Sequence, residues 1–345
     1  MAQAFLLYSL SIILMKIAAF EVRDDERPFF ARYGNREGLT LHLHPCPLSP
    51  STLALAEGCE GVTTLGQSRL NRSLLQELRK MNIRYVSSRT VGVNHIDIRA
   101  AEEFGIQISH AEYSIHGIAD FTIMLMLNCL RKYKQALFRG NVNDYSLTGF
   151  QGREMRHLTI GVIGTGSVGT AVIHSLSGFG CRILASSRHE NPSLSGLAEY
   201  VPLDDLFRLS DIITLHVSLT ESTRHLINRD TLARMKDGVI LINTARGSLI
   251  EVNALIEGIE SQKIGALGVD VFENEESIFH QDRRSDIISN RDMAYIRQFP
   301  NTVMTQHMAF YTLEAVESMV RCGIENILSM DAADCSPENP PPCLS

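Results

Sequence analysis

Three polar residues of types that take part in catalysis follow predicted strands in the second half of the sequence. Arg246 follows the run LINTA, Glu275 follows GVDVFEN, and His307 follows VMTQ. In open parallel α/β sheets, ligands bind beyond the carboxyl ends of the strands, so chemistry is expected at these positions. A guanidinium suits a carboxylate, and an imidazole can exchange a proton near neutral pH.

A glycine-rich turn between a predicted strand and a predicted helix indicates a ligand. Residues 158–163 are mostly apolar and rich in β-branched side chains, and Gly164, Gly166 and Gly169 follow at G-x-G-x-x-G spacing. The first glycine permits a tight turn, the second lets a pyrophosphate approach, and the third lets the helix pack on the strand. The helix is expected to end at Gly180, with its free N–H groups facing a phosphate. The context favours a dinucleotide site over a purely structural turn.

The composition limits the class of protein. The chain has 345 residues, enough for two domains, and is 44% hydrophobic and 21% charged. A net charge of −7 with a pI near 6.0 argues against a nucleic-acid or membrane surface. The seven cysteines (46, 59, 129, 181, 322, 335 and 343) have no C-x-x-C and no metal-ligand spacing. We therefore expect no metal site and a reducing, cytoplasmic compartment.

Residues 4–14, AFLLYSLSIIL, form an apolar stretch that has several interpretations. A signal-peptide core and a membrane anchor are alternatives, but these 11 residues fall short of the roughly 18 that span a bilayer. No Lys or Arg precedes them. The sequence favours a dispensable leader at residues 1–14 or an upstream start codon ahead of Met15.

Alternating strand-like and helical segments predict an α/β fold with two parallel sheets. Strands are expected at residues 16–22, 39–44, 61–65, 83–87 and 105–109, and then at 159–163, 182–185, 211–217, 238–242, 266–271 and 302–305. The first five indicate a smaller, flavodoxin-like unit, and the last six a Rossmann-type, doubly wound sheet. Residues 119–138 are expected to form one long buried helix.

The predicted helix at residues 312–330 could fold back on the first unit and make it discontinuous. The expected domains are a substrate domain of residues 15–112 with 311–332, and a dinucleotide-binding domain of residues 113–310. Residues 333–345 are proline-rich and are expected to be disordered.

Five motifs, in the same order along the chain, resemble those of the D-isomer-specific 2-hydroxyacid dehydrogenase family. They are RTVGVNHID (89–97), GTGSVG (164–169), INTARG around Arg246, GVDVFENE (268–275) and TQHMAFYT (305–312). The resemblance runs from Met15 to about Ile327 and is closest to the D-lactate dehydrogenase branch, including the vancomycin-resistance type.

This resemblance implies a homodimeric enzyme that reversibly reduces a 2-keto acid to the D-2-hydroxy acid with NAD(P)H. Pyruvate or a larger analogue is the expected substrate, with phenylpyruvate and branched 2-keto acids as further candidates. A dinucleotide-sensing regulatory protein, as corepressors on this scaffold illustrate, is the alternative.

The same resemblance implies roles for the three polar residues. Arg246 matches the arginine that binds the substrate carboxylate and polarises the carbonyl. His307 matches the general acid, and Glu275 matches the carboxylate that fixes the tautomer of this histidine. Glu273 and Glu276 are competitors for that last role.

Four further positions match the family's substrate pocket. The backbone at Val91 and Gly92 resembles a carboxylate cradle, Tyr113 matches a pocket tyrosine, and Phe310 matches a residue that limits pocket size. Either aromatic side chain could instead belong to the core. Leu65 stands where some members carry a tyrosine, which favours a less polar or differently sized pocket.

The resemblance places the cofactor around the glycine motif and beyond the strands that follow it. Asp270 resembles the residue that binds the nicotinamide carboxamide. The other expected cofactor residues are Gly164, Thr165, Gly166, Ser167, Val168, Gly169, His216, Val217, Asn243, Thr244 and Ala245.

The end of the second strand of this half departs from an NAD-specific site. Such a site places Asp or Glu there to bind the ribose 2′-hydroxyl, whereas this chain has Ser186, Ser187, Arg188 and His189. A hydroxyl followed by a guanidinium suits a 2′-phosphate, so Ser187 and Arg188 favour NADP(H), with NAD(H) as the alternative. The alternative is that Arg188 is an exposed surface arginine that binds no ligand.

A few other positions depart from the family pattern. Asn94 stands where aspartate is common, and Glu112, Ile115, Ser218 and Gln306 replace frequent prolines. Gln306 directly precedes His307, and without a proline the backbone there is less restricted. We expect the site to survive this change.

Overall fold

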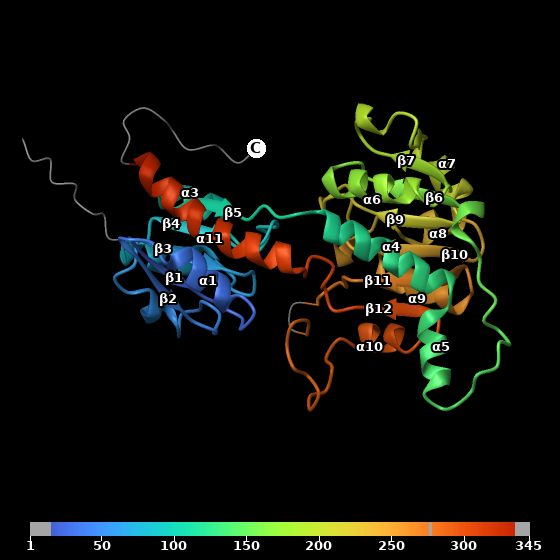
Figure 1. The fold of residues 1–345 in the computed structure, drawn as a ribbon, viewed down its shortest axis with the longest axis horizontal. Coiled ribbons are helices and arrows are strands. Elements are labelled where there is room, and N and C mark those ends of the chain that lie inside the picture. Colours follow the sequence, from blue (N-terminus) through green and yellow to red (C-terminus); the bar gives the residue numbers. More distant parts are fainter. Residues whose placement is uncertain (1–14, 276–277, 335–345) are drawn as a thin grey trace, which may run out of the picture. The chain divides into compact units, whose positions relative to one another are not determined.

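The structure is a computed structural model that describes residues 15–275 and 278–334. The expected leader, Glu276 and residues 335–345 of the expected tail lie outside the described residues. The chain divides into two compact units (Figure 1). The first unit contains the residues up to Ser114 and those from Thr312 onward, and the second unit runs from Ile115 to Tyr311.

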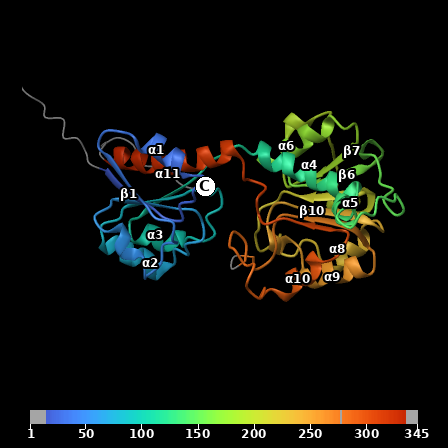
Figure 2. The ribbon, with the colours of Figure 1, turned by 60° about the horizontal axis from the view of Figure 1, so that its bottom comes forward.

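The first unit is a five-stranded parallel sheet with the strand order β2-β1-β3-β4-β5, which is the flavodoxin-like order. Its strands are β1 (Met15–Ala19), β2 (Leu39–Leu43), β3 (Gly61–Thr64), β4 (Tyr85–Ser88) and β5 (Gln107–His110). Its helices are α1 (Arg27–Gly34), α2 (Arg72–Lys80), α3 (Ile98–Glu103) and α11 (Leu313–Asp334), with a short 3₁₀ turn at Leu53–Ala56. Helices α1 and α11 cover one face of the sheet and α2 and α3 the other (Figure 2).

Successive side chains of β1 point to opposite faces of the sheet, so this strand contributes to the hydrophobic core on each side. Ile17 and Ala19 lie in the core with Val320 and Ile324 of α11, whereas Ala18 belongs to the core on the α2 and α3 side. Because α11 comes from the C-terminal part of the chain, the first unit is discontinuous, which confirms that prediction.

The second unit is a seven-stranded parallel sheet with the order β12-β11-β10-β9-β6-β7-β8. Its strands are β6 (Thr159–Ile163), β7 (Arg182–Ser186), β8 (Glu199–Tyr200), β9 (Ile212–Leu215), β10 (Val239–Asn243), β11 (Ile264–Val269) and β12 (Thr302–Met304). Its helices are α4 (His116–Leu130), α5 (Tyr133–Gly140), α6 (Ser167–Ser177), α7 (Leu203–Leu209), α8 (Arg229–Arg234), α9 (Val252–Glu260) and α10 (Arg291–Arg297). Short 3₁₀ turns occur at Met155–His157, Pro192–Leu194 and Gly247–Leu249.

The strand order confirms the Rossmann-type prediction. β6 pairs with β7 on one side and β9 on the other, so the order in which successive strands are added to the sheet reverses next to β6, where such sheets bind ligands. Helices α4 and α6 pack on one face, and α7, α8, α9 and α10 on the other. The carboxyl end of β6 therefore faces the switch point of a doubly wound sheet.

Two predictions about elements are wrong. The sheet has a seventh strand, β8, whose two residues are too few to give a periodic signal. The single helix expected at residues 119–138 is two helices, α4 and α5, separated at Lys132, which adopts a left-handed conformation with φ 52°. The Nζ of Lys134 then donates to the carbonyl oxygens of Arg297, Phe299 and Thr302 at 2.9, 2.9 and 2.7 Å, which ties α5 to the end of α10.

Helix α6 also ends earlier than expected, at Ser177, and Gly180 lies outside it with φ 68°. Within residues 15–275 and 278–334, no helix has the length and apolar character needed to cross a membrane.

Candidate active site

His307 and Glu275 form a hydrogen-bonded pair beyond the ends of β12 and β11. Nδ1 of His307 bonds to Oε1 of Glu275, and the backbone N–H of Phe272 donates to Oε2 of the same carboxylate. The side chains are 34% and 14% exposed, so the imidazole reaches solvent while the carboxylate is largely enclosed. A carboxylate on Nδ1 fixes the proton on that nitrogen and leaves Nε2 for a substrate.

The two competing glutamates differ in their surroundings. Oε1 of Glu273 accepts a hydrogen bond from Nη2 of Arg224 at 2.8 Å and lies 3.4 Å from Nε2 of His225. Glu273 thus has other partners, and Glu276 lies outside the described residues. Glu275 is the glutamate that the structure brings to His307.

Asp270 holds the backbone that carries His307. Its carbonyl oxygen accepts from the N–H of His307 at 2.7 Å, and its carboxylate accepts from Oγ1 of Thr305 at 2.5 Å. The carboxylate also accepts from the N–H groups of Met308 and Ala309 at 2.9 and 2.7 Å. Burial raises the pKa of Asp270, and these hydrogen bonds oppose that rise. Among the described residues, Oδ2 accepts one hydrogen bond and has room to accept another. The contact expected between Asp270 and the nicotinamide carboxamide stays a prediction.

Arg246 stands at the start of a 3₁₀ turn directly after β10. The side chain of Asn243 closes this turn, because its Nδ2 donates to the Arg246 carbonyl at 2.8 Å and its Oδ1 accepts from the N–H of Ala245 at 3.0 Å. A Cβ at Gly247 would lie 2.1 Å from the carbonyl carbon of Phe272, so the turn lies against the chain leading to Glu275. Within the described chain, the guanidinium donates a single hydrogen bond, to the Ala245 carbonyl at 2.7 Å. Its other donors are available to an anion.

The glycine motif has the shape that a phosphate-binding turn needs. Gly164 adopts φ 94°, and a Cβ there would lie 2.6 Å from the carbonyl oxygen of His216. A Cβ at Gly169 would lie 2.0 Å from the carbonyl oxygen of Gly164, whereas a Cβ at Gly166 would meet no described atom within 4 Å. Gly166 is the N-cap of α6 and provides no side-chain cap, so the first N–H groups of the helix are free for an anion.

His216 lies beside this turn, since its carbonyl oxygen faces Gly164. Burial lowers its pKa to about 3, and its Nε2 lies 2.9 Å from Oγ1 of Thr214. Thr244, another expected cofactor residue, is held at its Oγ1 by Oγ1 of Thr122 at 2.9 Å. These contacts position the residues without adding charge near a phosphate.

The loop after β7 presents an uncommitted cation near the glycine motif. Ser187, Arg188 and His189 are exposed, and none of them has a hydrogen bond or ion pair with another described residue. Two hydrogen bonds tie the far end of the loop to the motif: the N–H of Asn191 donates to the Tyr200 hydroxyl at 2.8 Å, and that hydroxyl donates to Oγ1 of Thr165 at 2.9 Å. The sequence carried no signal for this tie.

The expected carboxylate cradle lies in the first unit, after β4. Oγ1 of Thr90 donates to the carbonyl oxygen of Gly92 at 2.7 Å and lies 2.6 Å from Oγ of Ser88. Val91, between them, is 49% exposed. Two hydrogen bonds thus hold the turn, and Val91 is open to solvent; the carboxylate cradle stays a prediction.

Other expected pocket residues are distributed over both units. The N–H of Leu65 donates to Oε2 of the buried Glu21 at 2.6 Å, which fixes the loop after β3. Tyr113 is partly buried in the first unit. In the second unit, the ring of Phe310 lies 6.3 Å from the ring of His307, so the structure brings this expected substrate residue to the expected acid.

Comparisons with known proteins identify the family of this chain. Residues 123–309 match the family model described as D-isomer specific 2-hydroxyacid dehydrogenase, NAD binding domain. An aromatic 2-oxoacid reductase of Clostridium sporogenes is 41% identical over 315 residues, which cover 91% of this chain and 95% of that protein. A D-lactate dehydrogenase of Escherichia coli is 34% identical over 327 residues, covering 94% and 99%. The structure of a pyruvate reductase of Chlamydomonas reinhardtii has a TM-score of 0.86 at 32% identity, covering 92% and 97% of the two chains.

Proposed function

Because the chain belongs to the D-isomer-specific 2-hydroxyacid dehydrogenase family, we propose that it uses His307, Glu275 and Arg246 in the NAD(P)H-dependent reduction of a 2-keto acid to the D-2-hydroxy acid. The chain is an oxidoreductase of the D-lactate dehydrogenase branch that acts on a CH–OH group with NAD(P). The observation that supports these roles is the pair of His307 and Glu275, at the same edge of the sheet as the glycine motif.

Each of the three side chains has a distinct role. Arg246 binds the substrate carboxylate and polarises the adjacent carbonyl. His307 gives the proton on Nε2 to the carbonyl oxygen, and Glu275 stabilises the imidazolium before that transfer. When bound, the nicotinamide dinucleotide supplies the hydride for the carbonyl carbon. In the oxidative direction His307 accepts the hydroxyl proton.

The substrate we propose is pyruvate or a larger 2-keto acid, aromatic ones included. The apolar Leu65 supports a pocket that accepts apolar side chains, and proteins similar to this chain include an aromatic 2-oxoacid reductase and a D-lactate dehydrogenase. A panel of pyruvate, 2-ketoisocaproate and phenylpyruvate, run with NADH and NADPH, tests the proposal. Robust turnover supports the enzyme, whereas tight dinucleotide binding without turnover on any of them favours the regulatory alternative.

We propose that NADPH is used at least as well as NADH, because the Arg188 guanidinium is uncommitted within the described chain. Arg188→Ala is expected to raise the KM for NADPH roughly 10- to 100-fold, as loss of a charge-assisted hydrogen bond implies, and to leave the KM for NADH nearly unchanged. Steady-state kinetics with both cofactors measure this. Arg182→Ala is a matched control, because Arg182 lies at the opposite end of β7 and pairs with Glu199 at 2.7 Å. A strong NADH preference that persists in Arg188→Ala contradicts the assignment.

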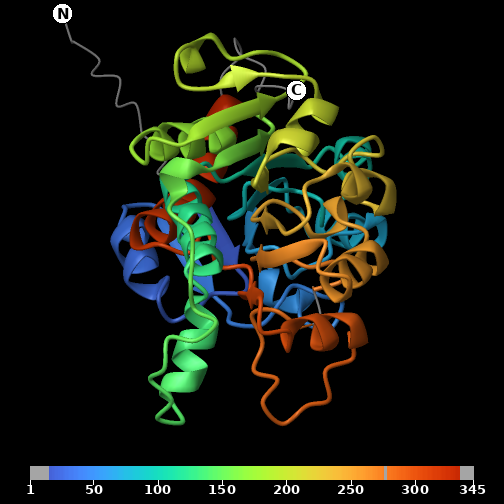
Figure 3. The same ribbon diagram turned by 90° about the vertical axis from the view of Figure 1, so that its right-hand side faces the viewer.

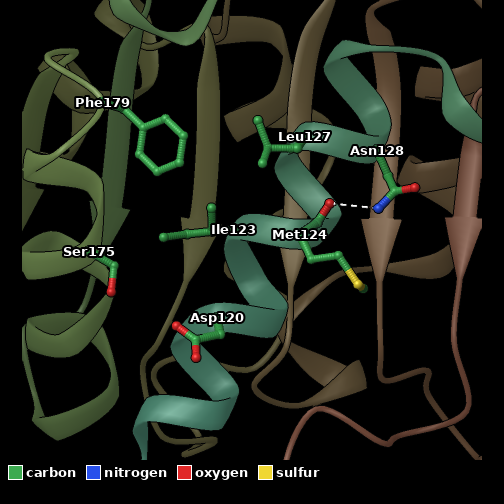
Figure 4. A pocket seen from close by; sticks show the side chains of 7 residues that line it. All are labelled: Asp120, Ile123, Met124, Leu127, Asn128, Ser175 and Phe179. Carbon is green, nitrogen blue, oxygen red and sulfur yellow. Dashed lines mark hydrogen bonds between the residues drawn. The ribbon is translucent and has the colours of Figure 1, made fainter.

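We also propose a homodimer whose subunits meet through α4, α5 and the segment after α5. Eight of the fourteen exposed large hydrophobic side chains in the described chain fall between residues 124 and 147, including Phe138 at 71% and Leu147 at 84% exposure. A shallow hollow of about 370 Å³ lies between α4 and α6, with Ile123, Leu127 and Phe179 at its wall (Figure 4). Figure 3 shows α5 and the following chain projecting from the second unit. Exposed apolar side chains concentrated in one segment in this way suit contact with a second copy of the chain.

Phe138→Glu combined with Leu147→Glu is expected to convert this dimer into a monomer, because it buries two charges in an apolar interface. Sedimentation equilibrium should give twice the 38.4 kDa chain mass for the unmodified protein and about one chain mass for the double variant. Ile287→Glu is the control, since Ile287 is even more exposed, at 97%, but lies far along the chain, before α10. A monomeric mass for the unmodified protein at micromolar concentration contradicts the proposal.

The location we propose is the cytoplasm. It rests on the odd, scattered set of seven cysteines, of which the five among the described residues are free thiols.

The substrate domain, in this proposal, is the first unit, with Val91 and Gly92 as its carboxylate cradle.

A further inference from the structure

His280 is a second histidine in contact with His307. Its Nε2 lies 3.0 Å from the main-chain carbonyl oxygen of His307. Because a carbonyl oxygen can only accept, Nε2 of His280 carries the proton in this hydrogen bond. The ring of His280 lies 6.1 Å from the ring of His307 and 6.2 Å from that of Phe310, with an edge-on arrangement toward Phe310.

The backbone of His307 needs support from its neighbours. Its φ of 54° is a left-handed conformation, which is unfavourable for a residue with a Cβ and persists only where surrounding contacts impose it. The N–H of His307 is held by the Asp270 carbonyl, but the preceding residue is an exposed Gln306, which restricts the chain less than a proline. Within the described chain, His280 supplies the hydrogen bond on the carbonyl side of His307.

The two restraints meet at the peptide group that joins His307 to Met308, whose N–H donates to Asp270 and whose carbonyl accepts from His280. Asp270 fixes the amide of His307 and the N–H groups of the two residues that follow, and His280 fixes the intervening carbonyl. A rotation of this carbonyl would change ψ of His307 and move its Cβ relative to Glu275. Because proton transfer depends steeply on the placement of the acid, such a rotation would slow the reaction.

We propose that His280 is a positioning residue that keeps the His307 imidazole aligned with Glu275 and supports the ring of Phe310. The inference rests on the proposed function, since it takes His307 as the general acid. His280 itself exchanges no proton with the substrate in this assignment; it acts through the backbone of His307.

Two substitutions separate the hydrogen bond from the ring contact. His280→Phe keeps a ring against Phe310 and removes the N–H donor, whereas His280→Gln places an amide N–H near the Nε2 position and removes the ring. We expect His280→Phe to lower kcat roughly tenfold, as loss of one hydrogen bond implies, with the KM for the keto acid and the Kd for the dinucleotide within about twofold of wild type. His280→Gln should retain at least about half of the wild-type kcat. His157→Phe is the control, because His157 is exposed and its partner is Glu154, 3.6 Å away.

A spectroscopic readout makes the test independent of turnover. The Nδ1 proton shared by His307 and Glu275 should give a downfield proton resonance in the full-length protein, assigned by its absence in His307→Gln. This resonance should shift or broaden in His280→Phe and stay in place in His280→Gln and His157→Phe. Thermal unfolding of each variant verifies that the fold is intact.

Wild-type kcat together with an unchanged resonance in His280→Phe overturns the proposal, and so does a His280→Gln variant as slow as His280→Phe. An unmodified protein that reduces no keto acid on the panel contradicts the proposed function instead. The resonance then still decides whether His280 positions His307. If His280→Phe does not fold, His280→Gln carries the test, since loss of the resonance in that variant overturns the hydrogen-bond role.

Discussion

His307→Ala is expected to lower kcat for 2-keto acid reduction roughly 100- to 10,000-fold, the range that a positioned general acid contributes. Glu275 bonds to Nδ1 of the imidazole, whereas Asp270 and His280 bond to the main-chain N–H and carbonyl of His307, so alanine removes the proton donor and keeps these main-chain bonds. Dinucleotide affinity should change little, because the glycine motif and the free N–H groups of α6 do not depend on this side chain.

Stopped-flow or steady-state kinetics measure kcat, and calorimetric titration with the cofactor measures Kd. His157→Ala is the matched control, because it removes an exposed histidine of the same unit. Turnover near wild type in His307→Ala would refute the assignment of the acid. A large loss of cofactor affinity would instead indicate that the substitution disturbs the sheet edge as a whole.

The fold was largely predictable because its main features have local physical causes. The glycine spacing after β6 is required by close approaches that a Cβ would block at Gly164 and Gly169. Strand alternation predicted two parallel sheets, and the orders observed are those of flavodoxin-like and Rossmann-type folds. The break at Lys132 was not predictable, since the hydrogen bonds that hold the following helix, from Lys134 to three carbonyl groups, reach residues more than 160 positions along the chain. A two-residue strand such as β8 has no periodicity to detect.

The site was predictable in its residue types more than in its contacts. Glu275 and His307 are 32 residues apart, and only the pairing of β11 with β12 in the sheet brings the two strand ends together. The use of Asp270 as an anchor for the His307 backbone also depends on that pairing. His280 lies in a stretch without a motif, so its hydrogen bond to His307 had no signal in the sequence.

Arg246→Ala is expected to lower kcat/KM for the keto acid roughly 30- to 4,000-fold, which corresponds to the loss of one partner of a hydrogen-bonded charge pair. Both parameters should change, because the guanidinium binds the carboxylate in the ground state and stabilises the developing charge on the carbonyl oxygen in the transition state. The turn itself should survive, since it is closed by the Asn243 side chain and by the close approach of Gly247 to Phe272.

Arg246→Lys distinguishes charge from geometry at the same position. A lysine keeps the positive charge but lacks the planar fork, so it should recover part of the carboxylate affinity and little of kcat. The Kd for the dinucleotide, measured by calorimetry, should stay within about twofold of wild type in both variants, and Arg182→Ala should behave as wild type throughout. If Arg246→Lys restored kcat fully, a point charge would suffice and the two-pronged contact with the substrate would be wrong. If Arg246→Ala kept the wild-type kcat/KM, the guanidinium would have no part in the reaction.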